Sequence, residues 1–356
     1  MLTTIISFII VISILVFVHE FGHFIVAKKT GVLVEEFAVG MGPQIIGKQR
    51  GETLYSIRLL PLGGYCKMTG EFPVDDEDEI EDVEHYQQAY ENERCLFQKS
   101  VFERAAVIFT GPLMNFILAM VVFSLIFAIF GVPVSGSSST VIGTILPDRP
   151  AQKAGLQAND KILSVNKEGV DNWSELAKKI NNHPGEELTL TVKRNGNIEK
   201  IKVTPKKDPK RDVGLIGIAP RLIREKVGIF TSIKYGFKQT IGVTVGIISG
   251  VWRMITGQMA PEVAGPVKIA QIVGDAAKAS ILKVLNLMAI LSVNLGILNL
   301  LPFPALDGGR LAFLGIELIR GKEIDPEKEG FVHFVGLVLL LALMVVIVYK
   351  DIVNIF

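Results

Sequence analysis

The sequence predicts a multi-pass α-helical membrane protein with about four transmembrane helices, a membrane-associated β-hairpin segment and one inserted α+β domain. Of the 356 residues, 49% are hydrophobic, which is high for a soluble protein of this length. Long apolar runs are separated by segments rich in Gly and Pro, and a polar block with alternating strand patterns lies between the second and third runs. The net charge of +1 argues against a nucleic-acid partner.

The first apolar run, in segment 1–30, contains His19, Glu20 and His23. Ionisable side chains in such a run are costly, so they need a partner or a function. On a helix the two histidines, four residues apart, lie on one face and can bind one metal ion, with Glu20 beside them. H-E-x-x-H on a helix is typical of zinc metalloproteases, in which the glutamate takes a proton from water. The alternative is a pair of histidines satisfied within the core, and the apolar surroundings favour the metal site.

The flanks of this run predict its orientation. No basic residue precedes it and no small-residue cleavage site closes it, which favours a retained span over a signal peptide. Lys28 and Lys29 follow directly, so its C-terminal end should lie on the cytosolic side. We therefore expect the metal close to the cytosolic face, about 7.5 Å of helix from Lys28.

Segment 31–70 is too broken for a helix and too apolar for a free loop. Alternating stretches such as "TLYSIRLLPL" predict a β-hairpin region that meets the membrane from the cytosolic side. The two cysteines, Cys66 and Cys95, fall in cytosolic segments and imply no disulfide. Neither has a neighbouring base or motif that would favour a thiol nucleophile over a reduced structural cysteine.

Segment 71–100 begins with an acidic stretch. Residues 71–93 include eleven acidic side chains and no Lys or Arg, which predicts a solvated, partly disordered loop, with a calcium or partner site as the alternative. A second span follows at 104–131 and contains "GPLMN", which ends at Asn115. Small residues allow close helix packing, and an intramembrane amide can hydrogen-bond between helices. A packing motif and a catalytic role both remain open.

The block at 136–207 predicts strands such as "ELTLTVKRNG" and helices such as "WSELAKKINN". It is similar to bacterial PDZ domains through Ala151, Ala154, Gly155, Leu156, Asp160, Ile162 and Asn166. Asn159 stands where such domains usually have Gly. PDZ domains bind an extended peptide or a free C-terminus by strand addition. A peptide-binding role and a purely steric gate both remain open.

Three further segments complete the expected domain order. Residues 222–260 are moderately apolar and are interrupted by Lys and Arg, which predicts a helix at the membrane interface. The third and fourth spans are expected within 278–310 and 330–352.

The third span ends in "NLGILNLLPFPALDGGRL", where two prolines predict an extended segment that carries Asp307. A carboxylate at membrane depth needs a cation, and a two-histidine zinc site lacks a third protein ligand. Asp307 is therefore the predicted third ligand. Glu317 is the alternative, and Glu35 and Glu36 are weaker candidates. His333, at the start of the last span, is expected at the interface rather than at the metal.

With these residues in place, the chain resembles the bacterial intramembrane zinc metalloproteases of the site-2 protease family in their single-PDZ form. The matching motifs are "HEFGH", "GMGP", "PLGGYCKM", "GPLMN" and "NLLPFPALDGG", in order along nearly the whole chain. The resemblance implies the following roles: Zn²⁺ ligands His19, His23 and Asp307, water activation by Glu20, a hold on the substrate carbonyl by Asn299, and an edge strand for the substrate near 40–68. Met41 departs from the family's usual "GFGP", which puts the local packing of the hairpin in doubt.

The resemblance implies hydrolysis of peptide bonds within membrane-spanning segments of other proteins, for this family anti-sigma factors and remnant signal peptides. It places the protein in the bacterial inner or plasma membrane, with the active site toward the cytosol and the PDZ domain on the other side. A non-hydrolytic zinc-containing scaffold or adaptor that uses its PDZ domain is the alternative. Glu20 argues against it, because a structural zinc site needs no base and closes its fourth position with a protein ligand. A transporter would require inverted repeats, and the sequence shows no internal repeat.

Overall fold

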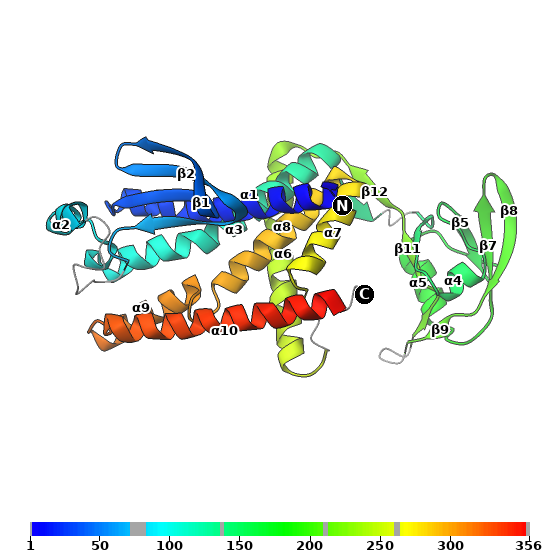
Figure 1. The fold of residues 1–356 in the computed structure, drawn as a ribbon. Helices are drawn as coiled ribbons and strands as arrows, with labels where there is room; N and C mark the ends of the chain where they lie inside the picture. Colours follow the sequence, from blue (N-terminus) through cyan, green and yellow to red (C-terminus); the bar gives the residue numbers. More distant parts are fainter. Residues whose placement is uncertain (1, 72–82, 136–138, 209–212, 260–263, 354–356) are drawn as a thin grey trace. The chain divides into compact units, whose positions relative to one another are not determined.

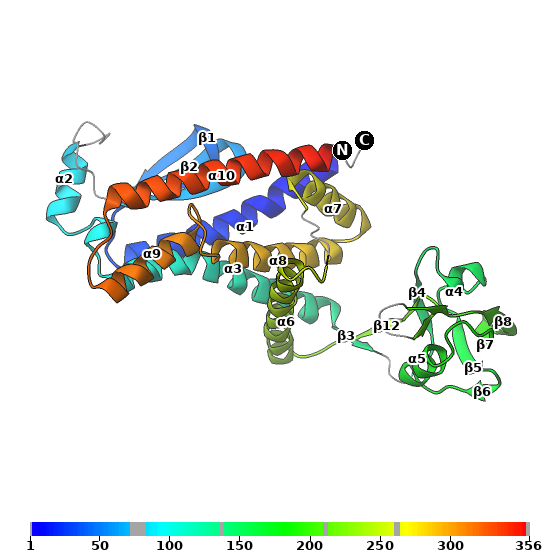
Figure 2. The same cartoon turned by 90° about the horizontal axis from the view of Figure 1, so that it is seen from below.

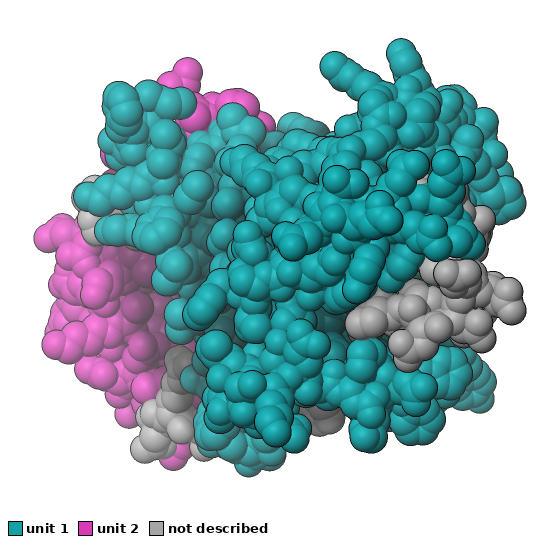
Figure 3. All heavy atoms as spheres, turned by 90° about the vertical axis from the view of Figure 1, so that its left-hand side faces the viewer, with its two compact units in different colours: residues 1–127, 229–356 teal, residues 128–228 magenta. Residues whose placement is uncertain are grey.

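The computed structural model describes residues 2–71, 83–135, 139–208, 213–259 and 264–353. The chain divides into two compact units, residues 1–127 with 229–356 and residues 128–228, which Figure 3 shows in teal and magenta. The second unit extends beyond both ends of the 136–207 block predicted for the inserted domain.

Four helices of the described chain are long and apolar enough to cross a membrane, as the sequence predicts. They are α1 (Leu2–Lys29), α3 (Val101–Phe130), α8 (Ile281–Asn299) and α10 (Pro326–Val353). Their axes are roughly aligned in Figures 1 and 2, and the chain direction alternates from one to the next. Large apolar side chains are exposed along them, Leu339 and Val346 of α10 among others. Such surfaces are those expected to face hydrocarbon.

The segment predicted as a β-hairpin forms β1 (Val34–Arg50) and β2 (Thr53–Met68). The first part of β1 is paired on both sides, since Ala38 is opposite Tyr65 on one side and Ser56 on the other. The end of β2, residues 64–68, is therefore an edge strand of this small sheet and is called the outer ribbon. Buried apolar residues join the sheet to α1 and α3; they are Ala27, Val32, Val34, Phe37, Cys66, Met68, Leu96 and Val107.

A buried polar network fixes the strands of this sheet. Glu36 accepts hydrogen bonds from Ser56, from Arg58 Nη2 at 2.7 Å and from the Tyr65 hydroxyl at 2.7 Å. Burial alone would raise the pKa of Glu36, but these hydrogen bonds outweigh it and lower that pKa. Burial and the hydrogen bond to Glu36 raise the pKa of Tyr65 to about 12. The network is satisfied by its own members, so it can hold the outer ribbon in register.

The acidic segment is more ordered than a solvated loop where the structure describes it. It contains the helix α2 (Val83–Glu91) and a short 3-10 turn at Leu96–Gln98. Residues 72–82, which carry most of its acidic run, lie outside the described residues.

The segment predicted as an interfacial helix contains α6 (Ile229–Ile255), which lies across the direction of the four spans in Figures 1 and 2. Its one buried face is made of small residues, Ser232, Gly236 and Thr240. Gly236 contacts Ser124 of α3 so closely that a side chain there would clash. The opposite face exposes large apolar side chains, which suits a helix at a membrane surface.

Two helices of the first unit did not follow from the sequence pattern. The helix α7 (Pro266–Ala279) has no side-chain cap of its own, and the Asp351 carboxylate of α10 accepts from the backbone of Lys268 at 2.9 Å instead. The second is α9 (Asp307–Arg320), which begins at the residue that the prolines were expected to leave in an extended segment.

The second unit contains a four-stranded antiparallel sheet in the order β6-β5-β7-β8, with β6 (Glu168–Gly169), β5 (Lys161–Val165), β7 (Leu188–Arg194) and β8 (Asn197–Val203). Four short strands form two further pairs, β4 (Ile142–Ile145) with β11 (Ile218–Pro220) and β9 (Lys206–Lys207) with β10 (Gly214–Leu215). The helices are α4 (Pro150–Lys153) and α5 (Trp173–Asn181). This α+β composition agrees with the predicted PDZ domain.

The first and last strands of the second unit pair with each other. The strand β3 (Val132–Ser135) forms an antiparallel ladder with β12 (Leu222–Glu225). The part of segment 222–260 that precedes α6 is thus a strand rather than the start of the interfacial helix. A groove of about 310 Å³ lies between α5 and β11, with Trp173, Ile180 and Ile218 among its lining residues.

A buried ion pair holds the PDZ-like unit together, and its loss should be measurable. Arg194 Nη2 donates to Asp160 at 2.7 Å, and the Asp160 side chain is 2% exposed. Burial would raise the pKa of Asp160, but the hydrogen bond from Arg194 lowers it overall. We predict that Arg194→Leu lowers the free energy of unfolding of this unit by about 2 kcal/mol at pH 7.

The pH dependence follows from the direction of that pKa shift. The stabilisation is complete above the unfolded pKa of about 3.9 and is lost as the pH falls through the lower folded pKa. The difference between wild type and variant should therefore shrink below about pH 4. Urea unfolding followed by Trp173 fluorescence measures it, and equal stabilities at pH 7 would contradict the prediction.

Candidate metal centre and active site

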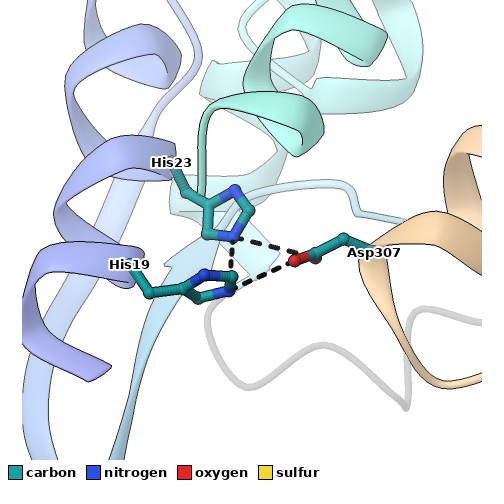
Figure 4. A group of neighbouring side chains, drawn as sticks. All are labelled: His19, His23 and Asp307. Carbon is teal, nitrogen blue, oxygen red and sulfur yellow. Dashed lines mark hydrogen bonds and ion pairs between the residues drawn. The ribbon is translucent and has the colours of Figure 1, made fainter. Parts of the chain in front are cut away.

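Three side chains predicted as metal ligands meet at one point. His19 and His23 of α1 are buried and direct their Nε2 atoms toward the Asp307 carboxylate (Figure 4). The distances are 3.1 Å from His19 Nε2 to Oδ2, 3.7 Å from His23 Nε2 to Oδ1 and 3.3 Å between the two Nε2 atoms. One ligand atom from each of the three lies within 4.8 Å of the other two, so among the described residues these side chains could bind one metal ion together.

The donor set and its spacing fit zinc. In a tetrahedral site with bonds of about 2.0 to 2.1 Å, ligand atoms lie about 3.3 Å apart. The three separations between His19, His23 and Asp307 bracket that value. Two imidazoles and one carboxylate also leave a fourth position for water or substrate, as catalytic zinc sites do.

Close contact between α1 and α3 makes room for the histidines. A Cβ atom on Gly22 of α1 would lie 2.4 Å from the carbonyl oxygen of Thr110, and one on Gly111 of α3 would lie 2.1 Å from His23 Nε2. Only glycine fits at either position. Gly111 of the "GPLMN" motif therefore packs closely against α1, and this packing makes room for the His23 ring.

Each histidine also has a polar partner at its second ring nitrogen. His23 Nδ1 lies 2.9 Å from the carbonyl oxygen of Val107 in α3. His19 Nδ1 lies 3.1 Å from the side-chain amide of Asn115, also in α3. These contacts fix the ring orientations, as partners of metal-binding histidines usually do.

Asn299, predicted to hold the substrate carbonyl, is the last residue of α8. Its Nδ2 atom lies 3.3 Å from His19 Nε2 and 3.5 Å from His19 Nδ1. It is partly exposed and lines the same pocket as the three ligands. Its amide is thus within reach of any group placed next to Asp307.

The segment that carries Asp307 is held by backbone contacts and by α10. A Cβ atom on Gly308 would lie 2.2 Å from the carbonyl oxygen of Leu301, so the chain must fold back tightly here. Ala305, with a positive φ of 73°, donates its N–H to His333 Nδ1 at 2.8 Å. His333 is thus not part of the metal group, as expected, but it supports the loop that leads to Asp307.

Glu20 lies beside the metal group. A pocket of about 500 Å³ is lined by Glu20, by the three ligands and by the end of β2. A Cβ atom on Gly64 of β2 would lie 3.6 Å from Glu20 Cγ, so the outer ribbon of the sheet contacts the predicted base directly.

The remaining candidate ligands are engaged elsewhere. Glu317 pairs with Arg104, and Glu36 belongs to the network with Arg58. Glu35 accepts from Thr69 at 2.8 Å and pairs with Lys67. Of these four acidic residues, Asp307 is the one that the structure brings to the two histidines.

The two thiols are buried. Burial raises the pKa of both, to about 11 for Cys95, and neighbouring carboxylates add to the effect. A thiol nucleophile is therefore disfavoured.

The contact at Gly111 gives a sharp prediction. Gly111→Ala should lower bound zinc strongly, because the added Cβ atom would occupy the space of the His23 ring. Gly246→Ala is the control, since Gly246 lies in helix α6 with open space around it. Elemental analysis of the purified proteins measures zinc per chain. Full zinc content in Gly111→Ala would show that the close contact is not required.

Comparisons with known proteins agree with this geometry. The sequence profile of peptidase family M50 matches residues 7–343. A protein of Geobacillus kaustophilus named zinc metalloprotease RasP is 37% identical, and the match covers 99% of this chain and 98% of the relative. The regulator of sigma-W protease RasP of Bacillus subtilis is 36% identical, with 99% of each chain covered.

Among solved structures, the PDZ domain of an SdrC-like protein from Listeria innocua is similar, with 21% identity and a TM-score of 0.21. The match covers 23% of this chain and 92% of the solved chain. The family profile spans most of the chain, and the two relatives match it nearly from end to end. The predicted zinc metalloprotease is thereby confirmed at the level of the family: this chain belongs to peptidase family M50.

Proposed function

We propose that this protein is an intramembrane protease that hydrolyses peptide bonds within membrane-spanning segments of other proteins. The observation that carries the proposal is the meeting of His19, His23 and Asp307 beside Glu20, with both histidines and Glu20 on a helix apolar enough to cross a membrane. The pocket that holds them is bordered by a β ribbon, which suits an extended peptide.

The two histidines and Asp307 would hold Zn²⁺. Bound there, the ion supplies Lewis-acid polarisation of the substrate carbonyl and makes water a better nucleophile near neutral pH.

Glu20 acts as the base. Its carboxylate takes a proton from the attacking water and delivers it to the nitrogen of the leaving amine. The Asn299 amide, beside His19, donates a hydrogen bond to the substrate oxygen as negative charge develops on it. Loss of such a donor costs about 10² to 10³ in rate.

The outer ribbon of β2 positions the substrate. A transmembrane helix hides its amide bonds, so the substrate must unwind locally, and lost hydrogen bonds are costly in lipid. Residues 64–68 pair with β1 on one side and border the pocket on the other. A substrate strand that adds to this ribbon recovers backbone hydrogen bonds next to Glu20.

The orientation and the partners are part of the same proposal. Lys28 and Lys29 favour a cytosolic location for the end of α1, and α3, the second span, would then return the chain to the far side before residues 128–228. We place the PDZ domain there, with its groove between α5 and β11 available to substrate peptides or as a steric gate. Membrane-spanning regulators of sigma factors and remnant signal peptides are the substrate classes we favour.

A zinc-containing scaffold is the competing function. A structural site would be closed by a fourth protein ligand. The described residues offer three ligands there, and Glu20 lies in the open pocket. The geometry therefore favours hydrolysis.

Removal of the base tests the mechanism. Glu20→Gln should retain zinc and lower the cleavage rate of a single-span model substrate by at least about 10²-fold, because the amide cannot accept the proton. Mass spectrometry of the products, with the wild type and a chelated sample in parallel, measures cleavage. Turnover close to that of the wild type would remove Glu20 as the base.

Removal of a ligand tests the metal centre. Asp307→Ala should lower bound zinc below one equivalent, because it leaves two of the three protein ligands. Glu317→Gln is the matched control on the same helix, and it should retain zinc. If Asp307→Ala keeps its zinc while Glu317→Gln loses it, the ligand assignment is wrong.

A further inference from the structure

Asn115 occupies a special position behind the metal centre. Its side chain is fully buried in α3, and its amide lies 3.1 Å from Nδ1 of His19, the ring nitrogen that points away from Asp307. Nε2 of the same ring is the atom that faces Asp307 and His23. Asn115 therefore contacts the side of His19 opposite the ion that the ring would bind.

The chemistry of the ring decides which end of the amide belongs there. An imidazole that binds a metal through Nε2 carries its proton on Nδ1, so it needs a hydrogen-bond acceptor at Nδ1. With its Nδ2 atom toward His19, Asn115 would bring two donors together, its own amide N–H and the Nδ1–H of the ring. Asn115 Oδ1 is buried and has no hydrogen-bond partner among the described residues.

Exchange of the two amide ends resolves both observations. The oxygen and nitrogen of an Asn amide are assigned from their partners, because their positions are almost identical. Rotation of the amide by a half turn places Oδ1 against His19 Nδ1–H. No hydrogen bond of Oδ1 is lost, because Oδ1 has no partner among the described residues before the rotation. It leaves the Nε2 lone pair free for the ion.

We infer that Asn115 is a positioning residue, whose Oδ1 atom accepts from His19 Nδ1–H and sets the tautomer and ring plane required to bind zinc. The inference rests on the proposed zinc centre. His23 is served in the same way by the carbonyl oxygen of Val107 at 2.9 Å. Helix α3 thus supplies one acceptor to each histidine, one from the backbone and one from a side chain.

The backbone of Asn115 also contacts α8. Ser292, fully buried, donates its hydroxyl to the backbone carbonyl oxygen of Asn115 at 2.7 Å. The helix that leads to Asp307 therefore also holds the turn of α3 that contacts His19.

Asn299, the other amide near His19, has a different position. Its Nδ2 atom lies 3.3 Å from Nε2 and 3.5 Å from Nδ1 of His19, and Asn299 lines the pocket. Asn115 is not among the residues that line this pocket. The two amides therefore divide the roles, with Asn299 toward substrate and Asn115 toward the ring.

The test compares zinc affinities of the full-length protein in detergent, by competition with a chelator. Asn115→Leu keeps the approximate volume but removes the acceptor, and it should weaken zinc binding about 10- to 100-fold. Asn115→Asp keeps an acceptor oxygen and should bind within a few-fold of wild type, as carboxylate–histidine–zinc arrangements do. The visible spectrum of the Co²⁺-loaded proteins should change for Asn115→Leu and remain for Asn115→Asp.

Ser292→Ala is the matched control, because it removes the contact to the Asn115 backbone and leaves the side-chain amide in place. It should retain most of the zinc affinity. If Asn115→Leu does not fold, Asn115→Ala removes the acceptor without added bulk and is expected to show the same loss.

Two results would overturn the inference: unchanged zinc affinity in Asn115→Leu or Asn115→Ala, or an equal loss in Ser292→Ala, which would indicate helix packing alone. Failure of the proposed zinc centre would give a different result, because the wild type would then bind no more zinc than Asp307→Ala.

Discussion

The contact between α1 and α3 at Gly22 and Gly111 is the constraint on which the proposed metal centre depends. At both positions a single added carbon would lie within 2.4 Å of an atom of the partner helix. Such an approach lets the His23 ring enter the surface of α3, where a backbone carbonyl fixes it. In lipid, where apolar side chains gain little from association, small residues and interhelical hydrogen bonds hold helices together. The same interactions therefore pack the membrane core and orient its histidines.

The position of Asp307, the proposed third ligand, depends on an interruption of helical structure. Between α8 and α9 the chain turns back tightly, and Gly308 lies against the carbonyl oxygen of Leu301. Irregular backbone at membrane depth requires internal partners for its polar groups. His333 of α10 supplies one, because it accepts from Ala305. Asp307, at the start of α9, is thereby presented to the two histidines from a different element, which is how a site with an open position can be assembled.

In the proposed mechanism, the β ribbon would couple substrate binding to Glu20. Glu36 ties Ser56, Arg58 and Tyr65 together, so the outer ribbon cannot shift without breaking a buried charged network. Gly64 on that ribbon contacts Glu20. A peptide paired with the ribbon as proposed would therefore lie next to Glu20 in a defined register. The departure of Met41 from the family pattern is accommodated by contact of its side chain with Gly63.

The sequence by itself determined the four spans, the β segment, the PDZ-like unit and the histidine pair, since apolar runs, period-two alternation and i, i+4 spacing are local properties. It also indicated Asp307, because a carboxylate in an apolar segment needs a cation. Only the tertiary structure decided that Asp307 begins a helix, that α7 is capped by Asp351, that Asn115 contacts His19, and that His333 accepts from Ala305. Each of these depends on hydrogen bonds between residues far apart in the chain, and no local pattern records such a pairing.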